Sequence, residues 1–276
     1  MRPVALLTDF GAADTYVGVM KSVILSRVRR ASFIDLTHDV PPGDVPGAAL
    51  RLWQAGPWLP RGTVILAVVD PGVGGPRRAI AVSAGRLFCV GPDNGIFSFL
   101  LDRSPRWSAV QIDVPPSASA TFHGRDVFAP AAARLCAGAA LSRLGAPVDD
   151  LVRLPVPELS VSADGFSGEV LAGDRFGNLV TSIGVLARRD GSILLEPWLP
   201  GGPVGRLDAA ACAAVLPDGR AVPLVRTFAD VPTGSPLAYI GSDGLLEIGI
   251  SGGSAARTLG VGRGARVSLR SCASGR

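Results

Sequence analysis

Two carboxylates stand close together in the N-terminal segment TDFGAAD, which runs from Thr8 to Asp14. Carboxylates can accept hydrogen bonds from the hydroxyls of a ribose, so Asp9 and Asp14 predict a turn that binds a nucleoside. A helix-capping aspartate beside a turn aspartate explains the same pattern at least as well. The spacing alone leaves both interpretations open.

A glycine-rich loop carries the next candidate groups, because the segment DPGVGGPRR, from Asp70 to Arg78, combines a carboxylate with guanidinium groups. The loop is not a P-loop, since the lysine and the Ser/Thr of that motif are missing, and Arg77 replaces the third glycine of a dinucleotide-binding loop. The glycines therefore predict a tight chain path. Asp70 and an arginine of this loop could converge, although such a pair taken alone is more often structural than catalytic.

The chain has 2 histidines, His38 and His123. His123 lies in the segment FHGRD just before a predicted helix, and a glycine-flanked turn suits a catalytic imidazole better than an apolar face does. For His38, at the end of a predicted strand, a structural hydrogen bond and a functional role are equally supported. The histidines and the 4 cysteines lack the spacing of a zinc site, and there is no G-x-S-x-G motif. We therefore expect no metal.

These residues follow elements that alternate in the α/β manner. The strongest strand pattern is the β-branched run Thr63–Val69, which leads into Asp70. Further strands are expected at Val4–Thr8, Ser32–Leu36, Ala79–Val82 and Leu87–Val90. Helical spacing predicts helices at Tyr16–Val28, Asp44–Ala55 and Asp126–Ala137. We therefore expect an N-terminal α/β domain with a mostly parallel sheet, whose strand ends present the polar residues.

The pattern changes in the second half, where glycine, proline and aspartate separate short β-like runs. The runs are Ser167–Ala172, Leu179–Ile183, Ser192–Leu195, Ala221–Val225, Leu237–Ile240, Leu245–Ile250 and Ala265–Leu269. They predict a smaller all-β, barrel-like domain. We expect the α/β domain at residues 1–150, a linker at 151–165 and the β domain at 166–276.

Composition excludes several classes of protein. Hydrophobic residues make up 47% and charged residues 18%, which suits a packed core rather than disorder. The net charge of +4 comes from scattered arginines and gives little support for nucleic-acid binding. The N-terminus lacks the apolar region of a signal peptide, and no apolar run is long enough to span a membrane. We expect a cytoplasmic protein with neither nucleic acid nor membrane as a partner.

Together these segments resemble the S-adenosylmethionine (SAM) hydrolases, also described as SAM hydroxide adenosyltransferases, whose halide-using relatives are the fluorinase and chlorinase enzymes. The resemblance covers nearly the whole chain in the family's order. It rests on LLTDFGAADTYVGVMK, IDLTHDVPPGDV, VVDPGVGGPRRAIAV, VGPDNGIFSFLL, TFHGRDVFAPAAA, GDRFGNLVTSI and TFADVPTGSPLAYIGSDGLLEIGISGGSA. It implies that water attacks the ribose 5′ carbon of SAM and yields adenosine and methionine, with no cofactor. It also implies a homotrimer with each site between the N-terminal domain of one subunit and the C-terminal domain of the next.

The resemblance also implies roles for single residues. Asp70, Arg77 and His123 correspond to the family's catalytic set, and Arg78 is the neighbour most easily confused with Arg77. The implied substrate contacts are Asp9 and Phe10 near the ribose, Asp14 and Asp174 at the methionine moiety, and Phe176, Asn178, Phe228, Ser242 and Ser251 around the adenine and the amino acid.

Two rival functions come from different classes. A halide adenosyltransferase would share the fold, but the set Asp70, Arg77 and His123 argues against it, as does Gly124, where the fluorinase has a halide-contacting serine. Ser251 stands where asparagine is usual, and Ile250 where a halogenase has arginine, so contacts to the adenine edge stay open. The second rival is a non-catalytic nucleoside- or SAM-binding protein, which a product assay would separate from an enzyme.

Overall fold

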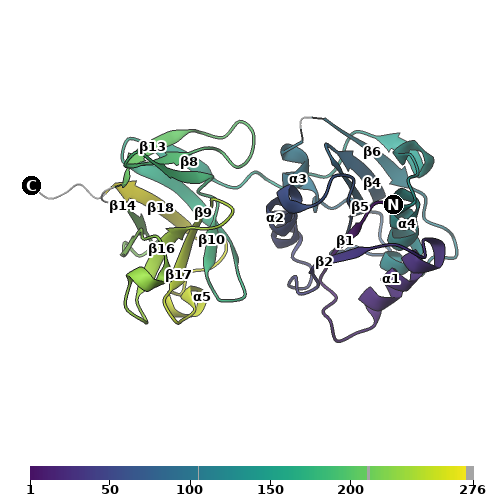
Figure 1. Ribbon diagram of the computed structural model, residues 1–276, viewed down its shortest axis with the longest axis horizontal. Coiled ribbons are helices and arrows are strands. Elements are labelled where there is room, and N and C mark those ends of the chain that lie inside the picture. The colour runs from purple at the N-terminus through teal and green to yellow at the C-terminus, as the bar shows by residue number, and fades with distance from the viewer. Residues whose placement is uncertain (105, 210–211, 272–276) are drawn as a thin grey trace, which may run out of the picture. The chain divides into compact units, whose positions relative to one another are not determined.

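The chain folds into two compact units, Met1–Leu154 and Pro155–Arg276. The computed structural model describes residues 1–104, 106–209 and 212–271. Figure 1 labels the elements of both units along the chain.

Unit 1 is built on a seven-stranded sheet with the order β2-β1-β3-β5-β4-β6-β7. Its strands are β1 Val4–Thr8, β2 Phe33–Thr37, β3 Val64–Val68, β4 Ala79–Ala84, β5 Leu87–Pro92, β6 Trp107–Ile112 and β7 Gly145–Val148. Its helices are α1 Tyr16–Arg27, α2 Val45–Ala55, α3 Ser98–Asp102 and α4 Ala129–Cys136, with short helical turns η1 Gly56–Trp58, η2 Gly124–Phe128 and η3 Leu141–Arg143. The strands and helices predicted for this half of the chain are confirmed to within a few residues, whereas β6, β7 and α3 were not predicted.

The order of the strands creates a switch point beside β1. From β1 the chain passes to β2 on one side and then to β3 on the other, and β1 runs parallel to both. Thr8 pairs with Val68, so the carboxyl ends of β1 and β3 lie next to each other. Ligands of open α/β sheets bind in the crevice outside such a switch point. This geometry brings the turn after Thr8 close to the loop that begins at Asp70.

The sheet is mixed, so the prediction of a mostly parallel sheet is only partly confirmed. The pairs β1–β2, β1–β3 and β3–β5 are parallel, but β4 pairs antiparallel with both β5 and β6, and β6 with β7. The physical reason is the tight turn between Ala84 and Leu87, where Gly85 has a φ of 57°. Strands joined by a two-residue turn can pair only in the antiparallel sense.

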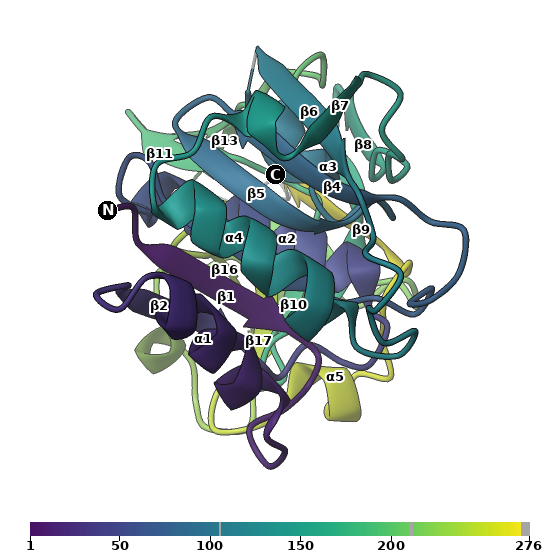
Figure 2. The same cartoon turned by 90° about the vertical axis from the view of Figure 1, so that its right-hand side faces the viewer.

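Helices cover both faces of this sheet. Side chains alternate along β1, so Val4 and Leu6 pack with α1 and α4, whereas Ala5 and Leu7 pack with α2 and α3. Figure 1 shows the two helix pairs on opposite sides of the sheet, and Figure 2 shows α1 and α4 crossing in front of it. Asp44 caps α2 as predicted, since its carboxylate accepts a hydrogen bond from the Gly47 amide at 3.0 Å.

Unit 2 is an antiparallel, nearly closed barrel-like sheet, which confirms the all-β prediction. Its main sheet has the order β15-β14-β18-β9-β10-β17-β16, with β8 added on β9, and β11, β12 and β13 form a second sheet. The strands are β8 Leu159–Ser162, β9 Gly165–Gly173, β10 Leu179–Thr181, β11 Leu186–Arg189, β12 Ser192–Leu195, β13 Gly205–Asp208, β14 Cys212–Val215, β15 Ala221–Pro223, β16 Pro236–Ile240, β17 Leu246–Ile250 and β18 Arg266–Ser271, and the helical segments are η5 Phe228–Asp230 and α5 Ala255–Thr258. A bridge between Leu224 and Ala238 brings the two edges together.

The structure also bears on the cysteines and on membrane insertion. Cys89, Cys136 and Cys212 are free thiols in buried positions, and Cys272 lies outside the described residues. Burial raises the pKa of the Cys89 thiol well above its usual range. Within the described parts of the chain, no helix has the length and apolar character needed to cross a bilayer.

Candidate active site

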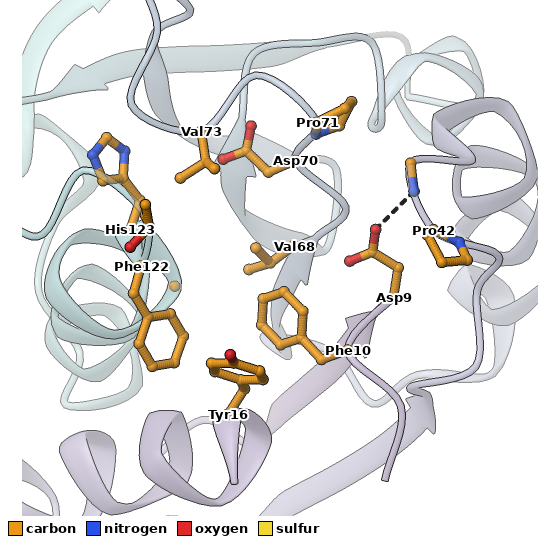
Figure 3. A pocket seen from close by; sticks show the side chains of 13 residues that line it. Asp9, Phe10, Tyr16, Pro42, Val68, Asp70, Pro71, Val73, Phe122 and His123 are labelled. Carbon is orange, nitrogen blue, oxygen red and sulfur yellow. Dashed lines mark hydrogen bonds between the residues drawn. The ribbon is translucent and has the colours of Figure 1, made fainter. Parts of the chain in front are cut away.

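The strand ends of unit 1 border a pocket of about 550 Å³. It is lined by Asp9, Phe10, Tyr16, Pro42, Gly43, Val68, Asp70, Pro71, Val73, Thr121, Phe122, His123 and Gly124. Figure 3 shows Asp9 and Phe10 on one side of it and, on the other, Phe122 and His123, which directly precede η2 in the chain. The switch point therefore carries a cavity of the size that a small ligand needs.

Three charged or titratable side chains meet beside this pocket. The Arg77 guanidinium donates to both oxygens of Asp70, with Nε to Oδ1 at 2.9 Å and Nη2 to Oδ2. Arg77 Nη2 also lies 2.8 Å from His123 Nδ1. Only 10% of the Arg77 side chain and 5% of the Asp70 side chain are exposed, and His123 is buried as well. A bidentate pair this far from water holds the guanidinium in one orientation against the imidazole.

The contact with Arg77 fixes how His123 carries its proton. A guanidinium can only donate hydrogen bonds, so Nδ1 of His123 must accept, and the neutral ring carries its hydrogen on Nε2. Burial and the charge of Arg77 lower the pKa of His123, against the opposing charges of Asp70 and Asp126. The imidazole therefore stays neutral at neutral pH and has an N–H donor to offer a ligand.

The third guanidinium nitrogen of Arg77, Nη1, has no hydrogen-bond partner in the part of the chain that the structure describes. This nitrogen is also buried. The guanidinium carbon lies 5.3 Å from the centre of the Phe128 ring. A buried donor without an acceptor is costly to maintain, and such groups gather at functional sites.

The neighbouring arginine points elsewhere. Arg78 donates through Nε to Asp93 Oδ2 at 2.8 Å and through Nη1 to Asp150 Oδ1 at 2.5 Å. Asp93 is almost fully buried, so Arg78 neutralises a carboxylate inside the fold. The two adjacent arginines therefore serve different partners, and it is Arg77 that lies with Asp70 and His123.

The turn after β1 supplies a carboxylate and an aromatic ring. Asp9 Oδ2 accepts a hydrogen bond from the Gly43 amide at 2.8 Å, drawn as a dashed line in Figure 3, and this leaves Oδ1 facing the pocket side. Phe10 packs against Tyr16 and Phe122, with ring centres 5.5 Å and 6.2 Å away. Asp14, by contrast, is exposed and does not line the pocket.

Among the lining residues of unit 1 that the sequence reasoning did not predict are three with large apolar or aromatic side chains. Tyr16, Val73 and Phe122 sit beside the polar motifs in the chain, and Tyr16 and Phe122 stack edge to face with ring centres 5.1 Å apart. Large aromatic residues next to a glycine-flanked histidine were the available signal. Together with Phe10 they make one wall of the pocket apolar.

Unit 2 carries a pocket of about 520 Å³ that is lined by Phe176, Asn178, Phe228, Ile250, Gly252, Gly253 and Arg257. Asp174 does not line this pocket but holds the lining residue Asn178, because its carboxylate accepts from the Asn178 backbone N–H and from Asn178 Nδ2, both at 2.8 Å. The tight loop between them holds Phe176 outward with 77% of its surface exposed. An exposed aromatic ring beside an ordered amide suits the binding of a flat polar ring.

The remaining residues predicted for unit 2 lie at different distances from this pocket. Ser251 follows the lining residue Ile250, and its hydroxyl donates to the Phe228 carbonyl at 3.3 Å. Ser242 is exposed in the turn between β16 and β17 and does not line the pocket. Arg257, on α5, lines it but was not predicted, since nothing in its local sequence sets it apart from other surface arginines. Within the described residues, no three His, Cys, Asp or Glu side chains gather as metal ligands would.

Comparison with known proteins identifies the family. Residues 4–145 match the SAM hydroxide adenosyltransferase N-terminal domain and residues 168–268 the corresponding C-terminal domain. The chain is 44% identical to an (R)-S-adenosyl-L-methionine hydrolase of Thermus thermophilus, with 98% of this chain and 100% of that protein covered. It is 43% identical to a protein of the same name from Salinispora tropica, with 96% of each covered, but only 28% identical to a fluorinase of Actinopolyspora mzabensis, again with 96% of each covered.

A solved structure gives the same result at the level of the fold. The chain superposes with a TM-score of 0.82 on a conserved protein of Thermotoga maritima, with 30% identity and with 97% of this chain and 99% of that chain covered. Two family domains in order, full-length relatives and a full-length structural match agree. The chain belongs to the SAM hydroxide adenosyltransferase family.

Proposed function

We propose that the protein hydrolyses S-adenosyl-L-methionine to adenosine and L-methionine, by attack of water or hydroxide on the ribose 5′ carbon. The observation that carries the proposal is the buried set Asp70, Arg77 and His123 at the switch-point pocket. The names of the relatives that share 43 to 44% of their residues with this chain support the same reaction.

The leaving group determines which step of the reaction the enzyme must assist. SAM is a sulfonium, so methionine departs as a neutral thioether and requires no acid. Water is a weak nucleophile, because its pKa in bulk is about 15.7 and little hydroxide is present at neutral pH. In our proposal Arg77 and the Nε2–H of His123 donate to the attacking oxygen and stabilise its hydroxide character, while Asp70 fixes the guanidinium. The new C–O bond forms as the C–S bond breaks, and the proton of water is released to solvent.

Binding must select one of the three carbons attached to sulfur. We propose that Asp9 and Phe10 hold the ribose, and that Asp174, Phe176, Asn178, Phe228 and Ser251 provide the surroundings of the adenine and the methionine. Asp14 and Ser242 line neither pocket, so they would contact only parts of the substrate that extend beyond the two pockets. Holding both ends of SAM aligns the oxygen with the C–S bond, and such alignment is worth several kcal/mol, or up to about 7–11 in the best cases.

We further propose a cytoplasmic homotrimer in which each site uses unit 1 of one subunit and unit 2 of the next. Unit 1 offers an open pocket lined by charged groups, and unit 2 offers an open pocket lined by aromatic and amide groups. We expect no cofactor, since the leaving group needs none, and no nucleic-acid or membrane partner. Light scattering at working concentration would test the assembly, and a fully active monomer would refute it.

The alternative is halide transfer to the same carbon. Gly124 argues against halide transfer, because it stands where the fluorinase has a halide-contacting serine. A Cβ at this position would lie 2.8 Å from Met20 Sδ and 3.2 Å from Phe122 Cε2. A serine there would force both neighbours to move. The hydrogen-bonding groups that favour water also leave no dry pocket for a desolvated anion.

The direct test is a product assay. Purified protein is treated with a chelator, incubated with SAM in the presence and absence of chloride and fluoride, and the products are separated by chromatography. We expect adenosine and methionine in equal amounts in every arm. A 5′-halo-5′-deoxyadenosine would support halide transfer, and SAM bound but unchanged would support a binding protein.

A further inference from the structure

A chain of hydrogen bonds in unit 1 lies outside the proposed catalytic set. Lys21 Nζ donates to Asp35 Oδ2 at 2.7 Å, Asp35 Oδ1 lies 3.0 Å from His38 Nε2, and His38 Nδ1 lies 2.9 Å from Thr8 Oγ1. We call these four residues the His38 relay. It runs from the second turn of α1, across β2, to the last residue of β1. None of the four lines the pocket.

Asp35 sets the direction of the hydrogen bonds at one end of the relay. Burial would raise the pKa of Asp35, but hydrogen bonds from Lys21 and His38 outweigh it and hold that pKa below its usual range. An ionised Asp35 can only accept, so Lys21 Nζ and His38 Nε2 both donate to it. At the other end, the Thr8 hydroxyl oxygen has two lone pairs, so it keeps one for another donor whichever partner donates in its contact with His38 Nδ1.

That donor belongs to the pocket. The Phe10 backbone N–H points to Thr8 Oγ1 at 3.3 Å, and the Gly11 N–H donates to the His38 carbonyl at 2.8 Å. His38 thus ties down the turn twice, once through its side chain and once through its backbone. Asp9 lies between these bonds, and its own carboxylate is held by the Gly43 amide. The turn that presents Asp9 and Phe10 to the pocket is fixed on both sides.

We propose that the His38 relay positions the Asp9–Phe10 turn for ribose binding. The inference rests on the proposed function for the identity of the ligand, and it assigns His38 as a positioning residue that does not touch the substrate. The composition fits this role, since the relay uses the only lysine of the chain and 1 of its 2 histidines. Thr8 is fully buried, where a valine would fill the same space without the hydroxyl.

Thr8 provides the sharpest variant. Thr8→Val keeps the buried volume and removes the hydroxyl, whereas Thr8→Ser keeps the hydroxyl. The matched control is Thr63→Val. Thr63 is also fully buried, and its hydroxyl donates to the Pro60 carbonyl at 2.7 Å. It precedes β3, however, and so lies at the opposite end of that strand from Asp70. His38→Gln tests the middle of the relay.

Two readouts separate positioning from general stability. The first is the split between KM and kcat for SAM. One hydrogen bond contributes about 0.5–1.5 kcal/mol, so we expect Thr8→Val and His38→Gln to raise KM about two- to twelvefold. We expect kcat to change by less than about twofold, because the catalytic set is untouched. The second is amide hydrogen exchange, which should accelerate at Phe10 and Gly11 in Thr8→Val and stay unchanged there in Thr63→Val.

Each outcome decides the matter. Raised KM with faster exchange at the turn, recovered in Thr8→Ser, supports the relay. It is overturned if Thr8→Val behaves like Thr63→Val, or if exchange accelerates while KM stays unchanged. If the wild-type protein turns over no SAM, the proposed function fails, and the affinity for adenosine, measured by calorimetry, replaces KM in the same comparison. A wild-type protein that binds no adenosine overturns the relay as well, since the turn then has no ribose to hold.

Discussion

Asp70, Arg77 and His123 form one hydrogen-bonded set, and the adjacent Arg78 binds other carboxylates. Spacing placed Asp70 at a strand end and drew attention to His123, but it could not separate Arg77 from Arg78, because both follow the same glycine-rich loop. The structure sends Arg77 to Asp70 and His123 and sends Arg78 to Asp93 and Asp150. Which way a side chain points depends on the path of the whole loop, and no local pattern records that path.

The two arginines give a matched pair of variants. We expect Asp70→Ala, Arg77→Ala and His123→Ala each to lower kcat at least about 100-fold, the scale of losing one positioned catalytic group. Arg78→Ala should keep most of its kcat but lower the unfolding midpoint, because it leaves the buried Asp93 without its positively charged partner. Steady-state kinetics and thermal unfolding measure the two effects. An inactive Arg78→Ala with a nearly normal Arg77→Ala would reverse the assignment.

The imidazole of His123 gives a pH prediction. Its neutral form accepts the hydrogen bond from Arg77, and protonation would place a second positive charge beside the guanidinium. Burial and Arg77 lower its pKa, so activity should persist as the pH falls through the ordinary histidine pKa of about 6.5 and be lost only below it. In Arg77→Ala the pKa of His123 should rise, while in Arg78→Ala it should not change. NMR titration of the two histidine rings measures this, and equal pKa values in wild type and Arg77→Ala would contradict it.

At the scale of elements, the sequence predicts what local rules decide. β3 is a β-branched run, α2 begins at a capping aspartate, and both form where expected. β14, with the sequence CAAV, has little strand propensity and exists only because β15 and β18 pair with it. The antiparallel position of β4 likewise depends on a turn and on β6, so tertiary pairing decides what propensity does not.

The pair of strands β16 and β17 carries an ionisable cross-strand contact. Tyr239 pairs with Glu247, and its hydroxyl donates to Glu247 Oε2 at 2.5 Å, while its ring lies 5.0 Å from that of Phe228. Burial raises the pKa of Glu247, the Tyr239 hydrogen bond opposes this, and the charges of Asp174 and Asp243 raise it further. The folded state thus disfavours the ionised carboxylate.

The sign of the effect on stability follows from that pKa. A carboxyl whose folded pKa lies above its unfolded value stabilises the fold at low pH, and this contribution is lost as the pH rises through the folded pKa. The difference in free energy of unfolding between Glu247→Gln and wild type should therefore favour the variant more at pH 8 than at pH 4. Denaturant midpoints at the two pH values measure this, with the exposed Glu158→Gln as the control. The same difference from wild type at both pH values would show that Glu247 ionises freely in the folded protein.

At the scale of the whole molecule, the two units bring different chemistry. Unit 1 contributes a switch-point pocket with a buried ion pair and an imidazole, and unit 2 contributes a pocket with exposed Phe176 and the ordered amide of Asn178. The resemblance of the whole chain predicted the family, which the comparisons confirm. Sequence reasoning could not find Arg257, nor foresee that Asp14 and Ser242 would be exposed, because exposure depends on packing between distant segments.

In the proposed reaction, an oxygen atom of water attacks the ribose 5′ carbon of SAM. Reaction in oxygen-18 water, followed by mass spectrometry of the products, follows that atom. We expect adenosine that carries one labelled oxygen, at the 5′-hydroxyl, together with unlabelled methionine. Adenosine without the label, or free adenine as the main product, would contradict this mechanism.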